Sequence, residues 1–226
     1  MASAAVPLAL HLGLDGAWDA LARELGLPSP ALPPGSGPRL RFCAPEREIE
    51  AFWSEVAPAL APFAGVPLLY GSGDFHHLAG LWLRRALGAE SVTLLSFDNH
   101  PDWAVTPPRW ACGGWINRAL ELPGIAEAAV WGCANMELNW PIRLLGNHRA
   151  VREGRLWLFP WRERFPKLAY GAWPWLDRAT WRERFAAFLA ERPGRRFYVT
   201  VDLDCLREGE ALTDWENGLF TVEDVA

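Results

Sequence analysis

The sequence contains little that would cross-link the chain or place it in a bilayer. Its four cysteines are widely spaced over 226 residues and include no Cys-x-x-Cys pair, so we expect reduced thiols and neither a disulfide framework nor a zinc ribbon. No run approaches the roughly 18 to 20 apolar residues of a membrane span. No basic residue precedes the first apolar run, which argues against a secretory signal. A cytoplasmic protein with no membrane partner is therefore expected.

Lysine is almost absent, since 21 of the 22 basic residues are arginine, and the formal net charge is -5. A negative net charge argues against nucleic acid as a partner. Thirteen of the basic residues nevertheless lie between Arg143 and Arg196, against five acidic residues there. We favour solvated helix faces for this stretch over an anion-attracting surface.

The length fits a single domain over residues 1–226. Half of the residues are apolar, which excludes a disordered chain or a fibrous repeat. Short apolar runs alternate with amphipathic stretches, which predicts an α/β fold of three layers, with a mostly parallel sheet covered by helices on both faces. The segment Leu27–Pro38, with five prolines and two glycines, is predicted to be a loop. The predicted strands are Val6–Leu12, Arg39–Cys43, Val66–Tyr70, Ser91–Phe97, Ala128–Trp131, Leu156–Phe159 and Phe197–Leu203. The predicted helices are Ala17–Leu25, Glu46–Leu60, His76–Leu87, Trp115–Leu120 and Thr180–Ala190.

The C-terminal residues have the sequence pattern of a helix N-terminus, but few residues follow it to form the rest of the helix. Thr221 and Asp224 have the spacing of a helix N-cap and its acidic partner. Only two residues follow, and one turn of helix cannot support itself. We interpret the chain as C-terminally truncated, the alternative being that this helix never forms.

Three segments put side chains able to bind metal directly after a predicted strand. The carboxyl ends of parallel strands meet at one edge of a sheet, where ligands bind. Residues two apart in extended backbone point the same way, so Asp98 with His100, and Asp202 with Asp204, can converge on one point. The segments are Leu68-Leu-Tyr-Gly-Ser-Gly-Asp-Phe-His-His77, Leu94-Leu-Ser-Phe-Asp-Asn-His-Pro-Asp-Trp103 and Phe197-Tyr-Val-Thr-Val-Asp-Leu-Asp204.

Such a set of acids and imidazoles favours a pair of divalent cations. Clustered carboxylates would repel one another if they were desolvated and unpaired, and cations remove that penalty. Mixed carboxylate and imidazole ligands suit manganese, zinc or iron better than calcium, and the lack of cysteine ligands argues against structural zinc. Helix capping by Asp74 is the simpler alternative, but it does not explain two histidines interleaved with the acids.

Each motif alone has other interpretations. A strand that ends in Asp-x-Asp also occurs in haloacid-dehalogenase-type phosphatases, but only 22 residues follow Asp204, where most of that domain should lie. The turn Gly71-Ser-Gly73 is similar to a dinucleotide-binding loop, but the third glycine of that loop would fall on His76. Both interpretations are therefore set aside.

Taken together and in this order, the three motifs resemble the ureohydrolase (arginase/agmatinase) family. That family has Gly-Gly-Asp-His, then Asp-Ala-His-x-Asp, then Ser-x-Asp-x-Asp, and it shares its fold with the histone deacetylases. The resemblance covers roughly Leu68 to Thr221, and the segment Asp214–Thr221 is similar to the Gly-Gly-Leu-Thr segment that follows the last family motif. It implies an arginase/deacetylase-like fold.

The resemblance also implies a cofactor of two Mn²⁺ ions per chain. One ion would be held by His76, Asp98, Asp102 and Asp202, and the other by Asp98, His100, Asp202 and Asp204. Asp98 and Asp202 would bridge the two ions. Asp102 would be the catalytic residue, because it would accept a hydrogen bond from a metal-bridging hydroxide and pass the proton to the leaving amine.

The chain departs from the family pattern in two places. Phe75 is inserted before the histidine of the first motif, so the ligand is His76 or His77, and we prefer His76. Trp115 or Asn117 stands near the place of the proton-shuttling histidine of the family. The glutamate that grips a guanidinium in the family would lie beyond Ala226.

The expected activity is hydrolysis of a carbon-nitrogen bond other than a peptide bond. Metal-bridging hydroxide would attack the guanidino or amidino carbon of a small-molecule substrate. One alternative is a metal-dependent deacetylase of acylated amines, which expects a His-His pair such as His76-His77 and a catalytic tyrosine. Another is a metal-binding pseudoenzyme. Members of the family often form trimers or hexamers, so a homo-oligomer is a further possibility, and nothing in the sequence selects its size.

The abundant tryptophans are expected to fill the core, the alternative being that some of them wall a pocket over the metals. Cys112 is expected to be an inert thiol, because the only basic residue near it in sequence is Arg109. The tryptophans that follow motifs or strand ends are Trp103, Trp110, Trp115, Trp131, Trp140 and Trp215.

Overall fold

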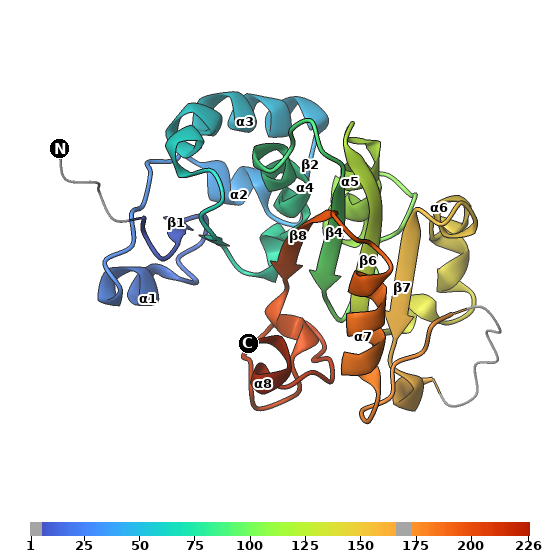
Figure 1. Ribbon diagram of the computed structural model, residues 1–226. Helices are drawn as coiled ribbons and strands as arrows, with labels where there is room; N and C mark the ends of the chain where they lie inside the picture. The colour runs from blue at the N-terminus through green and yellow to red at the C-terminus, as the bar shows by residue number, and fades with distance from the viewer. Residues whose placement is uncertain (1–5, 166–172) are drawn as a thin grey trace.

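A four-stranded parallel sheet forms the centre of the molecule (Figure 1). The computed structural model describes residues 6–165 and 173–226, so the first five residues, used above to argue against a signal sequence, lie outside the described residues. The strand order is β7-β6-β4-β8. The strands are β4 (Val92–Phe97), β6 (Ile125–Cys133), β7 (Leu156–Pro160) and β8 (Arg196–Val201). An α/β fold with a parallel sheet is confirmed.

The register of the strands brings the predicted site segments level with one another. Phe97, the last residue of β4, pairs with Trp131 of β6 and with Val201 of β8. Asp98 and Asp202, which follow directly, therefore leave the same edge of the sheet on adjacent strands. Every residue of β4 is buried, as expected for a central strand covered on both faces.

Helices cover both faces of this sheet. Leu94 of β4 belongs to the core cluster that contains α5 (Trp115–Glu121), and its neighbour Leu95 belongs to the cluster that contains α7 (Trp181–Ala190). Successive residues of a strand point to opposite faces, so these two helices lie on opposite sides of the sheet. This arrangement is compatible with the predicted three layers.

A third core cluster joins the N-terminal part of the chain to the sheet. It contains α3 (Glu46–Leu60), whose buried residues include Ile49, Phe52 and Val56 at the predicted helical spacing. Strand β1 (Leu10–Leu12) pairs in parallel with β3 (Leu68–Tyr70). Strand β2 (Cys43–Ala44) pairs antiparallel with β5 (Trp110–Ala111).

The remaining helices are short. The α-helices are α1 (Asp19–Glu24), α2 (Ser36–Leu40), α4 (Ala79–Trp82), α6 (His148–Arg152) and α8 (Val222–Val225). Single 3₁₀ turns, labelled η1 to η8, cover Ala61–Phe63, Gly73–Leu78, Leu83–Arg85, Cys112–Gly114, Met136–Leu138, Ile142–Leu145, Arg162–Arg164 and Leu203–Cys205. Many of these turns follow strand ends, so they hold irregular backbone close to the sheet edge.

Two predicted elements are wrong. The predicted strand Arg39–Cys43 is interrupted because α2 runs to Leu40, and only Cys43 falls in a strand. The Ser36 hydroxyl donates a hydrogen bond to the carbonyl of Pro33, which starts this helical turn inside the predicted loop Leu27–Pro38. The predicted helix His76–Leu87 is split into η2, α4 and η3, because the 3₁₀ turn η2 (Gly73–Leu78) already contains both histidines.

The other predicted elements are confirmed with shifted ends. Helix α3 has the predicted bounds, whereas β1 is ordered as a strand only over Leu10–Leu12. Strand β6 extends to Cys133, two residues beyond its predicted end. The longer strand places residues 134–138, which follow it, directly after the carboxyl edge of the sheet.

The C-terminal helix signal does form a helix. Thr221 and Asp224 make the capping box of α8, in which each side chain accepts a hydrogen bond from the backbone of the other. The Asp224 carboxylate is also bound by Arg178 at 3.0 Å and Arg182 at 2.6 Å. Tertiary ion pairs therefore supply the support that a single turn lacks, and the alternative that this helix never forms is wrong.

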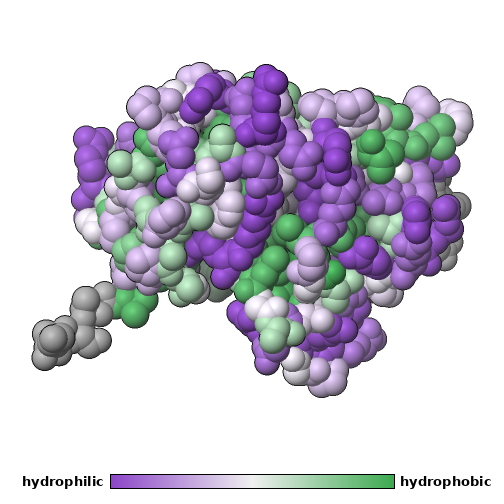
Figure 2. Space-filling model, turned by 90° about the horizontal axis from the view of Figure 1, so that it is seen from above, coloured by the Kyte–Doolittle hydropathy of each residue, from purple (hydrophilic) through white to green (hydrophobic). Residues whose placement is uncertain are grey.

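One face of the molecule is largely hydrophilic (Figure 2), and neither membrane-spanning helices nor disulfides are found among the described residues. Most of the face seen in Figure 2 is hydrophilic, with apolar side chains gathered near its centre. Within residues 6–165 and 173–226, no helix has the length and hydropathy needed to cross a membrane. All four cysteines are free, as expected.

Candidate metal centre

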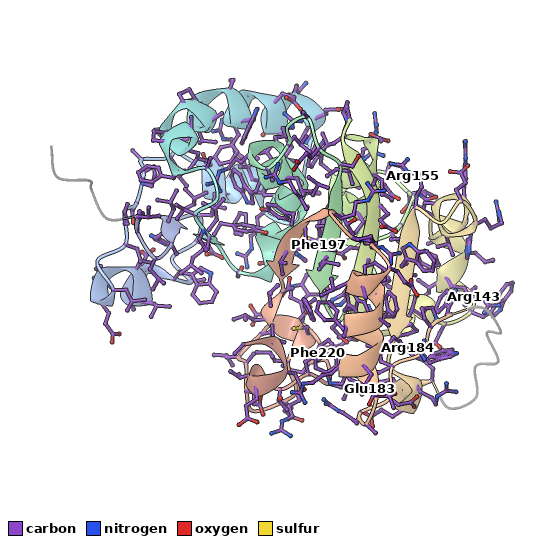
Figure 3. The ribbon with its side chains drawn as sticks, in the orientation of Figure 1. Arg143, Arg155, Glu183, Arg184, Phe197 and Phe220 are labelled. Carbon is purple, nitrogen blue, oxygen red and sulfur yellow. The ribbon has the colours of Figure 1, made fainter. Side chains whose placement is uncertain are left out.

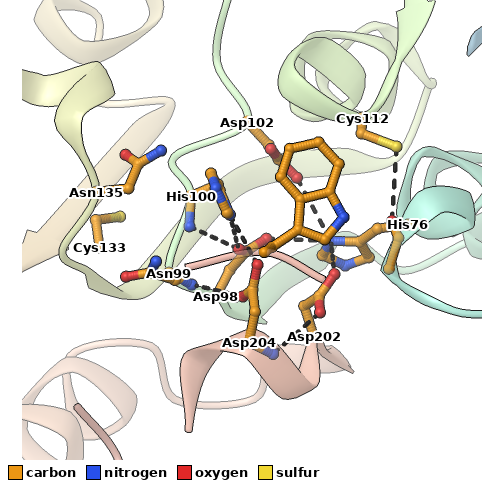
Figure 4. Close-up of polar contacts among 12 residues, drawn as sticks. His76, Asp98, Asn99, His100, Asp102, Cys112, Cys133, Asn135, Asp202 and Asp204 are labelled. Atoms are coloured by element: carbon orange, nitrogen blue, oxygen red, sulfur yellow. Dashed lines mark hydrogen bonds and ion pairs between the residues drawn. The ribbon is translucent and has the colours of Figure 1, made fainter. Parts of the chain in front are cut away.

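The side chains of the three predicted segments meet at the carboxyl ends of β4 and β8 (Figure 4). The imidazole of His76, carried by η2 after β3, lies at the centre of three carboxylates. Its Nδ1 is 3.1 Å from Asp98 Oδ2, 3.2 Å from Asp202 Oδ2 and 3.4 Å from Asp102 Oδ2. Residues that are far apart in the sequence thus surround one point.

A second group of ligands lies next to the first. His100 Nδ1 is 2.8 Å from Asp204 Oδ2 and 3.7 Å from Asp98 Oδ1. Two sets of three side chains could each hold a metal ion, because within each set the donor atoms all lie within 4.8 Å of one another. Asp98 belongs to both sets. Asp202 is in neither set, although it lines the same pocket. The sets are His76 with Asp98 and Asp102, and Asp98 with His100 and Asp204.

Backbone hydrogen bonds fix the carboxylates in their turns. The N–H of His100 donates to Asp98 Oδ1 at 2.7 Å, and the N–H of Asp204 donates to Asp202 Oδ1 at 3.2 Å. The N–H of Asn99 donates to Asp204 Oδ1 at 3.1 Å and so ties the turn after β4 to the turn after β8. The carboxylates are held before any metal binds, which lowers the entropy cost of binding.

Two backbone features allow this close approach. Asp102 has a φ of 46°, a left-handed conformation that is unfavourable for a residue with a Cβ and is found mainly where the surroundings impose it. A Cβ added to Gly73 would lie 3.3 Å from Asp202 Oδ2, so glycine lets the turn before His76 pass close to that carboxylate. Both features lie at the candidate site.

Neighbouring side chains orient the candidate ligands. The indole Nε1 of Trp115 donates a hydrogen bond to Asp102 Oδ2. Thr200 Oγ1 lies 3.3 Å from His76 Nε2, on the side of the ring away from the carboxylates. Partners of this kind fix the orientation of ligands in known metal sites.

Asp74 stabilises the rim of the site through ion pairing. Its Oδ2 is 2.6 Å from Arg41 Nη2, and its Oδ1 accepts a hydrogen bond from Trp215 Nε1 at 3.1 Å. The Trp215 ring in turn packs edge-on against His100, with ring centroids 5.4 Å apart. Asp74 therefore holds an aromatic side chain over His100, and the capping role considered above does not describe it.

Burial and mutual repulsion shift the pKa values of the clustered acids. Burial and the charges of Asp98 and Asp202 raise the pKa of Asp204 to about 7. Burial also raises the pKa of Asp102 and of Asp202. Burial lowers the pKa of His100, but hydrogen bonds and charge from Asp204 and Asp98 more than offset it and raise the pKa to about 12. Asp98 differs from the other three acids, because hydrogen bonds and charge from His100 and His76 lower its pKa despite its burial. Without a bound cation, the raised pKa values of Asp102, Asp202 and Asp204 favour their protonated forms.

The donor atoms fit a divalent metal ion. Asp98 Oδ2 is buried and accepts no hydrogen bond among the described residues, although it lies 3.1 Å from the His76 ring. A buried carboxylate oxygen left without a partner is costly, and coordination to a cation removes that cost. Carboxylate oxygens and imidazole nitrogens without thiolates suit manganese, iron or zinc.

The cavity over the cluster is small. Its volume is about 40 Å³, enough for a few water-sized groups. Only a group of a few atoms would fit beside the carboxylates in this conformation. The residues that line the cavity besides the cluster are Gly73, Cys112, Gly113, Glu137 and Trp215.

Glu137 is a functional candidate that the sequence reasoning missed. It lies in η5 after β6, where Asn135 caps the turn by accepting a hydrogen bond from the Glu137 N–H at 3.1 Å. Burial raises the pKa of Glu137. The rule that polar residues after strand ends form sites would have found it, but β6 was predicted to end at Trp131 instead of Cys133.

The structure separates His76 from its neighbour. His77 is fully buried and does not line the cavity; its Nδ1 lies 3.4 Å from Cys112 Sγ. Burial lowers the pKa of His77 to about 3, so this ring is neutral. Burial raises the pKa of Cys112 to about 12, as expected for an inert thiol. His76 is thus the histidine of the first motif that joins the cluster.

The motif-associated tryptophans divide between core and pocket. Trp103, Trp110 and Trp131 are buried in core clusters, as expected for filling residues. Trp115 is also buried, but it contacts the cluster through Asp102. Trp215 lines the cavity. Trp140 is 66% exposed and belongs neither to the buried core nor to the lining of the cavity.

In comparisons with known proteins, no family model and no curated protein matches this chain. The resemblance to ureohydrolases therefore rests on the three motifs alone. The geometry adds that the side chains of those motifs lie together in space, with one carboxylate shared between two ligand sets.

Proposed function

We propose that the protein is a metal-dependent hydrolase of the ureohydrolase type, with an arginase-like fold, that cleaves a carbon-nitrogen bond other than a peptide bond. The observation that carries the proposal is the pair of ligand sets that share Asp98 at the carboxyl edge of a parallel sheet. Shared carboxylates between adjacent sites are typical of two-metal hydrolases. The proposed substrates are small guanidino or amidino compounds.

The candidate ligands divide between two ions of Mn²⁺. His76 and Asp102 would hold one ion, His100 and Asp204 the other, and Asp98 would contact both. Asp202, whose Oδ2 lies 3.2 Å from His76 Nδ1, completes the first set and is proposed as a second bridge. When bound, the two ions would supply hydroxide near neutral pH and stabilise negative charge that develops on the substrate.

The protein side chains have two further proposed roles. Asp102 Oδ2 is held by the Trp115 indole and lies 3.4 Å from the His76 ring, so it is positioned to accept a proton and pass it to a leaving amine. The carboxyl of Glu137 lines the same cavity and would favour a substrate with positive charge. Trp215 narrows the entrance beside His100.

The geometry weighs against the deacetylase alternative. That alternative expects a pair of histidines and a tyrosine near one metal. His77 is directed at Cys112, and no tyrosine is among the described residues that line the cavity. The pseudoenzyme alternative is an outcome of the experiment below.

The decisive experiment combines metal analysis with a substrate screen. The purified protein is expected to contain about two manganese ions per chain and to release urea or amine from agmatine, arginine or guanidinobutyrate. Acetylpolyamines in the same screen test the deacetylase. Asp102→Asn should abolish turnover, whereas Asp177→Asn, at an exposed ion pair with Arg162, should not.

Each outcome has a defined meaning. Manganese binding without hydrolysis of any of these substrates would favour the metal-binding pseudoenzyme. Absence of any bound divalent metal would contradict the proposal.

A further inference from the structure

A second cavity, larger than the one at the metal centre, lies between α5 and α6. Its volume is about 340 Å³, within the range of small-molecule sites, and none of the candidate metal ligands lines it. Its walls come from α5, from α6 and from the segment that follows Asp102. The charged residues that line it are Arg109, Arg118, Arg149, Arg155, Glu121 and Glu153. Four arginines thus face two glutamates.

The two glutamates do not pair with all the guanidinium nitrogens of Arg118 and Arg155, the two most buried arginines of the cavity. Arg118 pairs through Nη1 with Glu121, which it shares with Arg109, and the Nε of Arg118 is buried without a hydrogen-bond partner. Arg155, which lies just before β7 (labelled in Figure 3), donates Nη2 to the carbonyls of Leu120 and Ile125 at 2.7 and 3.2 Å. Among the described residues, no carboxylate lies within 4.0 Å of Arg155.

The outer charges of the cavity are already paired with each other. Arg149 and Glu153, one helical turn apart, form an ion pair at 2.7 Å, and the Arg149 side chain is 82% exposed. This pair forms the rim and contributes no net charge. Arg109 also pairs with Glu46 at 3.5 Å. The excess of positive charge therefore belongs to Arg118 and Arg155, with Glu121 as their only carboxylate partner among the described residues.

Two asparagines make the inner wall rigid. Asn117 Nδ2 donates to the carbonyl of Ala104 at 2.8 Å, and Asn147 Nδ2 donates to Asn117 Oδ1 at 2.7 Å. Asn147 Oδ1 accepts from the N–H of Ala150 at 2.9 Å. A wall whose amides are satisfied keeps its shape, so a ligand would meet a preformed cavity with unpaired guanidinium donors.

We propose that this cavity binds a small anion that carries a carboxylate or a phosphate group. Arg118 and Arg155 would donate charge-assisted hydrogen bonds to the anion, because the planar guanidinium matches both groups. An anion would also relieve the repulsion between like charges around the cavity. The site is separate from the metal centre, so its test is independent of the proposed hydrolase activity.

Calorimetric titration of the full chain with inorganic phosphate and, separately, with succinate tests the proposal, with sodium chloride at matched ionic strength as the baseline. We expect saturable binding of at least one anion. Arg118→Gln and Arg155→Gln should each weaken that binding by about tenfold or more, as loss of a charged hydrogen bond does. Glu121→Gln should tighten anion binding, because the substitution removes the carboxylate that competes for the arginines. Partial unfolding of the variant could only weaken the binding, so a gain in affinity cannot come from loss of folded protein.

Arg23→Gln is the matched control, since Arg23 on α1 is exposed and contacts only the carbonyl of Asp19 among the described residues. Its affinity for the anion should equal that of the unchanged protein. Binding of phosphate alone or of succinate alone that is lost in the arginine variants supports the proposal and identifies the group. Two outcomes overturn it: no saturable binding beyond chloride, or binding that is unchanged in Arg118→Gln and Glu121→Gln, which would place the anion elsewhere, as at the metal centre.

Discussion

Carboxylates at the two ends of the central sheet have different partners. At the amino end, Glu127 of β6 is held by Arg192, with distances of 2.6 and 3.0 Å between its carboxylate oxygens and the guanidinium nitrogens. Trp157 Nε1 and Thr93 Oγ1 donate to the same carboxylate at 2.8 and 3.2 Å. At the carboxyl end, the clustered carboxylates of Asp98, Asp102, Asp202 and Asp204 contact two histidines and no arginine among the described residues.

The two ends also differ in how their surroundings shift the carboxyl pKa values. Burial opposes the ionised form of Glu127, but hydrogen bonds and charge from Arg192 lower its pKa below the ordinary value of 4.5. Burial and neighbouring acids instead raise the pKa of Asp204 to about 7. At the amino end an arginine pairs with the carboxylate, whereas at the carboxyl end four acids share two histidines. Clusters of acids with strongly shifted pKa values are common at binding sites.

The largest effect should follow from removing the acid shared by the two ligand sets. Asp98→Ala should lower bound manganese from about two ions per chain to nearly none, as measured by elemental analysis after desalting. Glu127→Gln, at the other end of the sheet, should keep the full amount. Unchanged metal content in Asp98→Ala would remove the basis for the distinction between the two ends.

The next largest effect should be on stability and should come from the amino end. Arg192→Met leaves the half-buried Glu127 without its cation, which should lower the free energy of unfolding by about 1.5–3 kcal/mol, as loss of a hydrogen bond to a charged group does; urea denaturation measures the change. Metal content should not change. Arg196→Gln, which removes an exposed partner of Glu90 at 3.8 Å, should cost less than about 1 kcal/mol. Equal losses in the two variants would contradict the structural role of Glu127 and Arg192.

A smaller effect should come from the partner that orients Asp102. Trp115→Phe keeps an aromatic ring but removes the hydrogen bond to Asp102 Oδ2. Manganese affinity, measured by competition with a chelator, should fall by about 10- to 100-fold. The control is Trp110→Phe, at a buried indole whose Nε1 has no hydrogen-bond partner among the described residues. If both variants lose affinity equally, the hydrogen bond is not the cause.

The smallest effect should be on the acid sensitivity of folding. The folded-state pKa of Glu127 is lowered, so the stability that it contributes is present above pH 4.5 and is lost as the pH falls through the folded-state pKa. Glu127→Gln should therefore be less stable than the unchanged protein at pH 7, with a difference that narrows below pH 4.5. A difference that stays constant down to pH 3 would show that Glu127 acts through packing instead of charge.

Local sequence signals predicted the parts of the fold that depend on local rules. The strands of the central sheet and the helix Glu46–Leu60 follow from apolar periodicity, and the structure places them close to the expected bounds. The same rule placed Asp98 and Asp202 near one sheet edge, although Asp202 lay inside the predicted strand Phe197–Leu203 and directly follows the observed strand, which ends at Val201. The predicted strand Arg39–Cys43 failed where a serine hydroxyl and a proline carbonyl start a helical turn instead.

Other features of the site depend on contacts between distant segments. Glu137 lines the cavity from the turn that follows β6, whose end at Cys133 the sequence pattern did not predict. The arginine-rich cavity includes Arg109 and Arg118, outside the basic stretch from Arg143 to Arg196, so counting charges along the sequence could not define it. Solvated faces were the favoured interpretation of that stretch, and Arg149 fits it, whereas Arg155 is half-buried.

By itself, the sequence determined which segments form the sheet and which acids and histidines follow its strands, because strand periodicity and strand ends are local properties. The tertiary structure decided that His76 joins the cluster while His77 is directed at Cys112, and that Trp115 holds Asp102. It also decided that Glu127 pairs with an arginine while the acids at the other end share two histidines. These outcomes depend on which side chains are brought within a few ångströms across long separations in the chain, and no local pattern contains that information.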